Sequence, residues 1–533
     1  MQLSLFKVRN VVMLCTWLCL LRCGDPEDDA ARALLTLTPP PGTFVAEVAV
    51  EVRSRDRTAT LHYTLDGSLP TPQAPILSST LRLTQTTEVR VLVVKPDGQT
   101  TVRSALYLRV DEEVASFSSN LPVVIVHMMG SEAPSPDDHT YQRAGLLIAE
   151  PRMAGRATPV NPDAETARAG IKVRGRSTRY DAKHSYSLET WGDIDQKDLG
   201  MSLLGMPSES DWALYAPFTW DRSYMRNALM YALSHDLGRY AARTRFVELF
   251  LTQGDQPVSM TDYLGIYVFM ERLTRDPQRV AIQSLRGQEL TAPDITGGYI
   301  VKVDDPGDGE RGFSAAGLRF AHVYPDEEDT SDDQQRYIAR YLEDVAAAAK
   351  HAPTSHDGRP LPPYQALIDV GSFIDHHILN TFAKNPDALR LSAFFHKDRG
   401  EPLHAGPIWD FDRSLGSNDE RSTDPTGWSA SQDGTRLFEH PLWVDLFADE
   451  NFRTAYRTRF REVLQGALAP ARVHAHIHRF ATELDEASRR DADRWPEARP
   501  ANGRYDNEVQ ALLQWTEARS RWIDANLQSV GDE

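Results

Sequence analysis

The stretch GPIWDFDRSLG (residues 406–416) places two aspartates, Asp410 and Asp412, one residue apart inside an apolar segment. On a β-strand, side chains two residues apart point to the same face, so both carboxylates would converge and the two aromatic residues beside them would pack inward. Neighbouring carboxylates raise each other's pKa unless a cation lies between them. The pattern therefore favours a site for a hard divalent ion. The alternative is a turn-capping aspartate beside one that pairs with Arg413.

A second acidic segment, NPDALRLSAFF (385–395), follows a helix predicted over residues 370–385. Asn385 and Asp387 would lie on the loop between this helix and the next strand. An Asn–Asp pair in such a loop can supply a metal ligand and a general base, which is the division of labour found in phosphoryl transfer. Both residues are also common in helix ends and proline turns, so a purely structural role stays open.

The basic counterpart of these acids lies in a hairpin predicted over residues 169–190. Its polar side chains could hold phosphate through charge and hydroxyl contacts; they are Arg174, Arg176, Ser177 and Lys183. Glu271 ends an apolar strand predicted over 264–273, and a carboxylate there could orient Lys183. The simpler alternative is that each of these residues forms an ion pair on the protein surface.

Composition excludes several classes of protein. The chain has 533 residues, 41% of them hydrophobic and 25% charged, and a formal net charge of −18. This composition is typical of globular proteins, and the length leaves room for several domains. The negative charge and the lack of a Lys/Arg-rich run argue against nucleic-acid binding. The Walker phosphate loop, HExxH and GxSxG do not occur.

The first 23 residues differ from the rest. Lys7 and Arg9 precede the apolar run VVMLCTWLCLL (11–21), which has the length of a signal-peptide core. All three cysteines (Cys15, Cys19 and Cys23) lie in this segment. Cys23, in LLRCG (20–24), resembles the lipidation site of bacterial lipoproteins. We therefore expect export, either as a lipoprotein anchored through Cys23 or as a periplasmic or secreted protein, with no transmembrane helix in the mature chain.

The body of the chain divides into two parts. Residues 34–112 alternate short β-type runs with turn sequences, which predicts a small β-sandwich. From about residue 120 to 525 the pattern is mixed: helices are predicted over 223–238, 334–352 and 370–385, a hairpin over 392–412, and a largely helical C-terminal part thereafter. The expected fold class is α+β.

Both parts resemble known families. HYTLDGSLPT (62–71) followed by TTEVRVLVVKPDG (86–98) resembles the chitobiase/β-hexosaminidase C-terminal-like module. Seven segments in order resemble the spore-coat protein H (CotH) kinase family over about residues 120–525; they include IKVRGRST, MRNAL, YLGIYVFMERL, GGYIVKVD and WDFD. This resemblance implies an atypical protein-kinase-like fold that uses ATP with Mg²⁺ or Mn²⁺ to phosphorylate serine or threonine in proteins.

The resemblance also implies roles for individual residues. Asp387 would be the catalytic base, Asp410 would be the metal-binding acid, and Asp412 would be a second ligand or a structural neighbour. Asn385, from the Asn–Asp pair described above, is expected as a further metal ligand. The remaining residues that it places around the nucleotide are Arg174, Lys183, Arg226, Asn227 and Glu271. Ser177 of the predicted hairpin is expected at the same site. The adenine-stacking residue stays open among Trp212, Trp220 and Trp409, and the protein substrate is unknown.

Two other functions are compatible with the residues. The D-x-D pattern also occurs in metal-dependent enzymes that use nucleotide sugars, which predicts a preference for a sugar nucleotide over ATP. A surface assembly or adhesion protein could keep the fold without catalysis, and its function would survive replacement of Asp387 or Asp410 by alanine.

Overall fold

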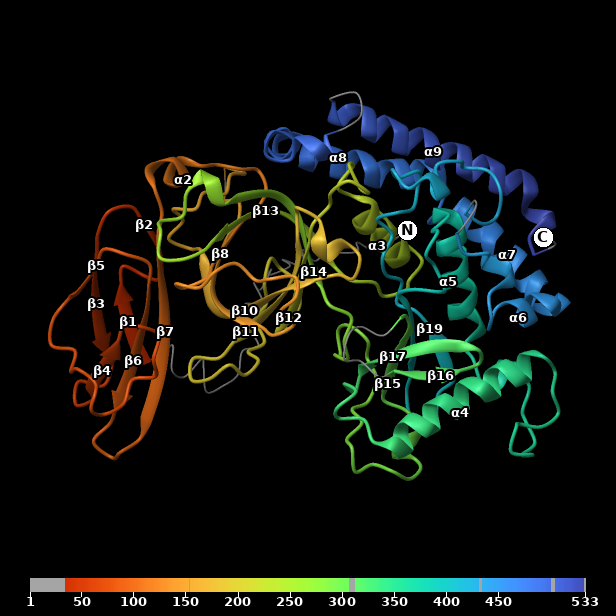
Figure 1. Cartoon of the computed structure of the whole chain (residues 1–533), viewed down its shortest axis with the longest axis horizontal. Coiled ribbons are helices and arrows are strands. Elements are labelled where there is room, and N and C mark those ends of the chain that lie inside the picture. Colours follow the sequence, from red (N-terminus) through yellow and green to blue (C-terminus); the bar gives the residue numbers. More distant parts are fainter. Residues whose placement is uncertain (1–33, 153, 306–311, 431–433, 500–503, 532–533) are drawn as a thin grey trace, which may run out of the picture.

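The computed structural model describes residues 34–152, 154–305, 312–430, 434–499 and 504–531. The predicted signal segment and the predicted lipidation site at Cys23 lie outside these residues. Within them, no helix has the length and apolar character needed to cross a membrane. Three β-structures follow one another along the chain, and helices cover the last of them (Figure 1).

The N-terminal module consists of two facing sheets, with strand orders β1-β3-β5 and β2-β7-β6-β4. Alternation places apolar side chains such as Leu37, Val50 and Val91 between the sheets. The bounds of its strands are β1 (Leu35–Thr38), β2 (Gly42–Phe44), β3 (Val48–Ser54), β4 (Thr60–Thr64), β5 (Leu81–Leu83), β6 (Thr87–Val94) and β7 (Thr100–Arg109). The module is rich in strands, as the sequence predicts.

A short helix, α2 (Glu112–Ser116), leads into a closed barrel of order β10-β11-β12-β14-β13-β8-β9. Ile171 and Val173 of β10 point into the barrel core, so Lys172 and Arg174 of the same strand point outward. The strands are β8 (Val123–His127), β9 (Gln142–Ala149), β10 (Glu165–Arg174), β11 (Ser185–Trp191), β12 (Asp211–Tyr215), β13 (Thr244–Thr252) and β14 (Tyr263–Glu271).

A five-stranded sheet of order β16-β17-β15-β18-β19 follows. Its strands are β15 (Tyr299–Val303), β16 (Phe313–Ala315), β17 (Leu318–Tyr324), β18 (Ala393–Lys397) and β19 (Leu403–Ala405). The predicted hairpin is present as β18 and β19, but its second strand ends at Ala405. The prediction that residues 403–412 form one strand is therefore wrong, and the two aspartates lie in a loop.

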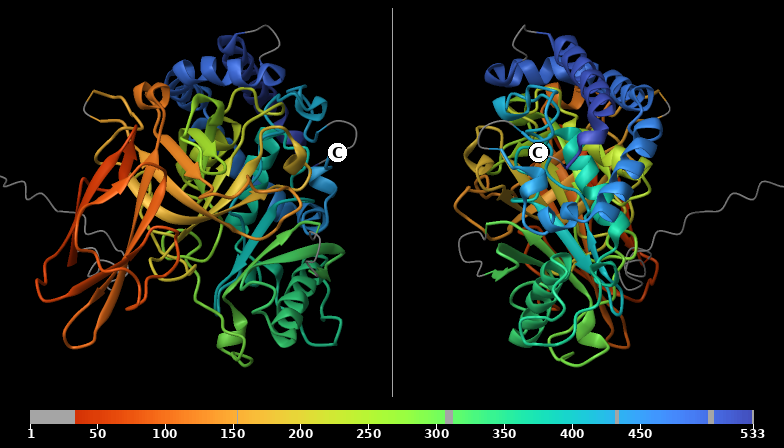
Figure 2. Two further views of the ribbon diagram at one scale, coloured as in Figure 1. Left: turned by 60° about the vertical axis from the view of Figure 1, so that its left-hand side comes forward. Right: turned by 90° about the vertical axis from the view of Figure 1, so that its right-hand side faces the viewer.

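Helices surround this sheet and close one side of the barrel. In Figure 1, α4 lies beside β16, while α8 and α9 run along the top of the molecule, and Figure 2 shows the same arrangement from two other sides. The bounds are α3 (Arg226–Asp236), α4 (Asp332–Ala349), α5 (Val370–Ala383), α6 (Val444–Ala448), α7 (Glu450–Gln465), α8 (Pro470–Arg494) and α9 (Tyr505–Asn526). The three predicted helices correspond to α3, α4 and α5.

The N-terminal module is joined to the barrel by a buried ionic contact. Glu88 of β6 has 4% of its side chain exposed and lies 2.8 Å from the Arg168 guanidinium on β10 and 2.5 Å from that of Arg143 on β9. An apolar cluster that contains Leu106 of β7 and Ile125 of β8 continues across the junction. The module is thus packed into the molecule rather than carried on a flexible linker.

Candidate active site

The loop that carries the two aspartates is held from two directions. It begins where β19 ends, and Asp410 adopts a left-handed backbone conformation with φ of 67°. The Asn227 side-chain oxygen accepts a hydrogen bond from the Phe411 amide at 2.7 Å, and the Asn385 amide group donates to the Asp410 carbonyl at 2.9 Å. A strained backbone of this kind persists only where its surroundings impose it.

The first residues of α3 brace the same loop. Arg226 is 2% exposed, pairs with Asp221 at 2.8 Å, and donates to the carbonyls of Ser414 at 3.1 Å and Gly416 at 3.2 Å. Arg226 and Asn227 were expected to line the nucleotide site. In the structure both side chains are buried and committed to the loop, so they position the aspartates from behind.

The carboxylates of the loop lie in one electrostatic cluster. The pKa of Asp412 is raised well above its ordinary value, first by burial and then by the charge of Asp410. The pKa of Asp410 is raised by the surrounding protein and then by the charge of Asp387, although the Asp410 side chain still reaches solvent. Among the described residues, no group donates a hydrogen bond to the Asp412 carboxylate. These are the properties of a site that a cation would stabilise.

The donor set suits Mg²⁺ or Mn²⁺ bound together with phosphate. No three His, Cys, Asp or Glu side chains in the described part of the chain form a metal cage. Asp410 and Asp412 would therefore be two protein ligands, and Mg²⁺ commonly takes one or two carboxylates and completes its shell with phosphate and water. The Asn385 side-chain oxygen accepts from the Asp387 amide at 3.2 Å, so Asn385 links the two acidic segments instead of pointing an unused oxygen at the site.

Arg174 adds a guanidinium group to the same site. Its guanidinium lies 5.4 Å from the centre of the Trp409 ring, and its Nη1 atom is buried without a hydrogen-bond partner among the residues that the structure describes. Burial lowers the pKa of Arg174 to about 10, and the charge of Asp410 opposes this. A buried guanidinium nitrogen without an acceptor is costly, so this corner of the site is suited to an anionic ligand.

Lys183 and Glu271 do not form the predicted pair. Lys183 Nζ lies 2.6 Å from Asp491 Oδ1 on α8, with 0% and 1% of the two side chains exposed. Glu271 instead accepts hydrogen bonds from Tyr240 at 3.0 Å and from the Arg243 side chain at 2.7 Å. The prediction failed because both residues found closer partners from other elements. Ser177, also assigned to the nucleotide, lies exposed in the loop after β10.

Three further polar residues were not predicted: Ser392 and Asp304 act on Asp410, and Lys172 shares a strand face with Arg174. Lys172 lies on the same outer face of β10 as Arg174, 4.2 Å above the Tyr141 ring. Ser392 donates to Asp410 Oδ2 at 3.4 Å. The charge of Asp304, which pairs with Lys302 at 2.8 Å, also raises the pKa of Asp410. The alternation K-V-R in IKVR was the available signal for Lys172, because it places that lysine and Arg174 on one face.

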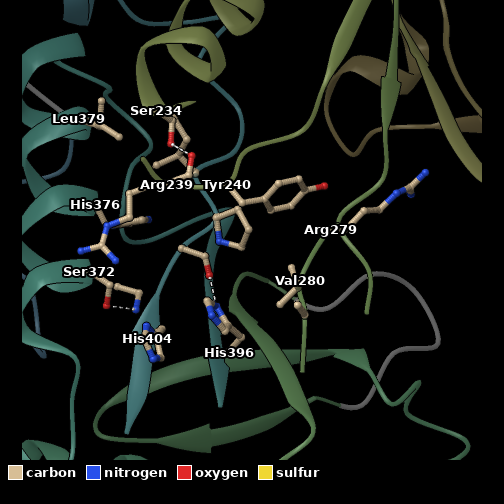
Figure 3. Close-up of a pocket in the computed structure, with 15 residues that line it drawn as sticks. Ser234, Arg239, Tyr240, Arg279, Val280, Ser372, His376, Leu379, His396 and His404 are labelled. Atoms are coloured by element: carbon tan, nitrogen blue, oxygen red, sulfur yellow. Dashed lines mark hydrogen bonds between the residues drawn. The ribbon is translucent and has the colours of Figure 1, made fainter. Parts of the chain in front are cut away.

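A cavity of about 140 Å³ lies behind the loop, lined in part by residues 406–408. In Figure 3, the side chains of His396 on β18 and His404 on β19 lie below Arg239. Burial lowers the pKa of His376 and of His396 to about 4, so both are neutral at pH 7. The His396 Nδ1 atom lies 3.0 Å from the Gly406 carbonyl, a contact that ties β18 to the start of the loop.

The geometry defines an α+β protein with an acidic, phosphate-compatible site where the barrel meets the five-stranded sheet. The family model described as CotH kinase protein matches residues 171–523, and that described as chitobiase/beta-hexosaminidase C-terminal domain matches residues 39–104. The chain belongs to the CotH kinase protein family and carries a chitobiase/hexosaminidase C-terminal domain. No curated protein matches it.

Proposed function

We propose that this protein is an exported kinase that uses ATP and a divalent metal ion to phosphorylate serine or threonine residues of surface or secreted proteins. One observation carries the proposal. Two neighbouring carboxylates, Asp410 and Asp412, share a site with a buried nitrogen of Arg174 that has no hydrogen-bond partner in the described part of the chain. A metal–phosphate ligand supplies both the cation that the carboxylates need and the anion that the arginine needs.

The nucleotide base would bind against Trp409. Trp212 is fully buried inside the barrel, and the ring of Trp220 lies under Arg413 at 4.1 Å. Trp409 is half-buried, directly precedes Asp410, and stacks on Tyr231 with ring centres 5.9 Å apart. An aromatic face beside the phosphate site is the usual platform for a purine. In this proposal, the barrel and the five-stranded sheet act as the two lobes of a kinase-like fold.

Asp387 would act as the base for the acceptor hydroxyl. Its amide donates to Asn385, which also holds the Asp410 carbonyl, so the base and the metal-binding loop have a common support. The bound metal would neutralise phosphate charge, and the protein would orient the donor and remove the hydroxyl proton. The proposal that the protein is exported is based on the basic residues and the apolar run within residues 1–23.

Phosphate transfer from labelled ATP tests this function. The mature chain would be incubated with γ-labelled ATP, a generic protein acceptor, and Mg²⁺ or Mn²⁺. We expect label transfer that falls at least about 100-fold in Asp410→Ala and in Asp387→Ala. Asp485→Ala is the matched control, because its side chain is 52% exposed on α8. Equal transfer by wild type and both site variants would contradict the proposal, as would binding of a sugar nucleotide in preference to ATP.

A further inference from the structure

Three arginines gather around Asp387. Arg421 donates to the Asp387 carboxylate at 3.0 and 3.4 Å, Arg390 also donates to it, and Arg413 lies 4.0 Å from it. The sequence gives no reason to expect this cluster, because Arg421 lies 34 residues beyond Asp387. One carboxylate cannot neutralise three guanidinium groups, so an acidic second partner is required.

That partner is Asp419, which fixes two of the arginines. Its side chain is 6% exposed and accepts from Arg421 at 2.8 and 2.5 Å, and it lies 3.6 Å from Arg413. Arg413 also stacks over the Trp220 ring at 4.1 Å. Arg421 and Arg413 are thus held in place, with 19% and 22% of their side chains exposed, whereas Arg390 is 43% exposed and its Asp387 contact spans only three residues.

We propose that Arg421 and Arg413 bind the oxygens of the phosphoryl group while it passes from ATP to the acceptor. This inference rests on the proposed kinase function. Guanidinium groups already in place next to the base stabilise developing negative charge without reorganisation. Asp419 is a positioning residue, because it acts only through these two arginines.

Phosphoryl transfer forms one bond, breaks another and releases one proton. The acceptor hydroxyl oxygen forms a bond to the γ-phosphorus, the bond from that phosphorus to the β,γ-bridging oxygen breaks, and ADP leaves. The hydroxyl proton goes to Asp387. Arg421 and Arg413 keep their protons and contact the non-bridging oxygens, whose charge is greatest in the transition state.

Kinetics of the full mature chain test the assignment. In Arg421→Gln we expect kcat to fall about 100-fold or more, with KM for ATP changed less than about fivefold, because the contact strengthens in the transition state. Arg421→Lys should recover part of the loss, since it keeps a charge without the two-pronged geometry. Arg489→Gln is the control and should change kcat less than about fivefold, because this side chain is 74% exposed in an ion pair with Asp485 on α8.

If a variant is unstable or no acceptor is found, binding of a mimic of the transferring phosphoryl group can be measured instead. Titration with ADP, Mg²⁺ and aluminium fluoride, which mimics the transferring phosphoryl group, should change the Trp220 fluorescence through Arg413. The signal should disappear in Trp220→Phe and weaken at least about tenfold in Arg421→Gln.

Two results would overturn the inference. One is a kcat in Arg421→Gln that equals that of the wild type. The other is a fluorescence signal in the titration with ADP, Mg²⁺ and aluminium fluoride that is as strong in Arg421→Gln as in the wild type. Absence of phosphate transfer by the wild-type protein would instead refute the kinase function, and the titration would still decide whether these arginines bind a phosphoryl mimic.

Discussion

Lys183 Nζ lies 2.6 Å from Asp491 Oδ1, in an ion pair that connects the start of β11 to helix α8 with almost no exposure of either side chain. Asp491 also accepts a hydrogen bond from the Ile266 amide on β14 at 2.8 Å. The contact therefore fastens a C-terminal helix to two strands of the barrel.

Replacement of Asp491 by asparagine should destabilise the protein by about 3–5 kcal/mol, because it leaves a buried lysine without its counter-charge. The free energy of unfolding from urea denaturation measures this. Asp493→Asn, on the same helix with 84% of its side chain exposed, is the control and should cost less than about 0.5 kcal/mol. Similar losses in the two variants would contradict the expected role of the pair.

Substitution at Gly265 should disturb the same contact from the barrel side. Gly265 has φ of 84°, and an added Cβ would lie 2.1 Å from Asp491 Oδ1. Gly265→Ala combines about 1–2 kcal/mol of backbone strain with displacement of Asp491. Gly254→Ala isolates the strain, because its φ is 66° and a Cβ added there would meet no atom within 4 Å. A thermal shift in Gly265→Ala no larger than that in Gly254→Ala would refute the steric argument.

The N-terminal module should depend on Glu88. In Glu88→Ala, the buried guanidinium of Arg168 loses its carboxylate, and the expected cost is about 3–5 kcal/mol. Limited proteolysis should then cleave between the module and the barrel earlier than in the wild type. Glu51→Ala, on an exposed part of the same module, should leave the digestion pattern unchanged. An unchanged pattern in Glu88→Ala would indicate that the apolar contacts alone hold the junction.

Divalent metal should stabilise the protein in a pH-dependent way. The raised pKa values of Asp410 and Asp412 mean that the folded state binds more protons than the unfolded state above the ordinary aspartate pKa of 3.8. Without metal, stability therefore falls as the pH rises through the folded-state pKa values. Mg²⁺ competes with those protons, so its effect should be larger at pH 8 than at pH 5.

Thermal unfolding with and without Mg²⁺ measures this effect, which would reach about 2.7 kcal/mol at a metal concentration 100 times the Kd. Asp412→Asn should be more stable than the wild type without metal and should lose most of the Mg²⁺ response. Asp485→Asn should behave like the wild type. A Mg²⁺ response that survives in Asp412→Asn would place the metal elsewhere.

Much of the architecture was predictable because its signals are local. Alternation of apolar residues indicated the strand-rich module, and a 3.6-residue period with end signals indicated α3, α4 and α5. The acidic segments around Asp387 and Asp410 were also recognisable, and the family match covers both. The strand predicted over 403–412 failed, because residues after Ala405 follow contacts from α3 rather than a ladder of strand hydrogen bonds.

The sequence by itself thus determined the order of strands and helices, the family, and the two acidic segments. Only the tertiary structure decided which charges meet. Lys183 and Asp491 are separated by 308 residues, and Arg226 and Ser414 by 188. Local patterns record the period and burial of a segment, but the partner of a charged side chain depends on how distant elements pack. The same packing placed Arg413, Arg421 and Asp419 beside Asp387.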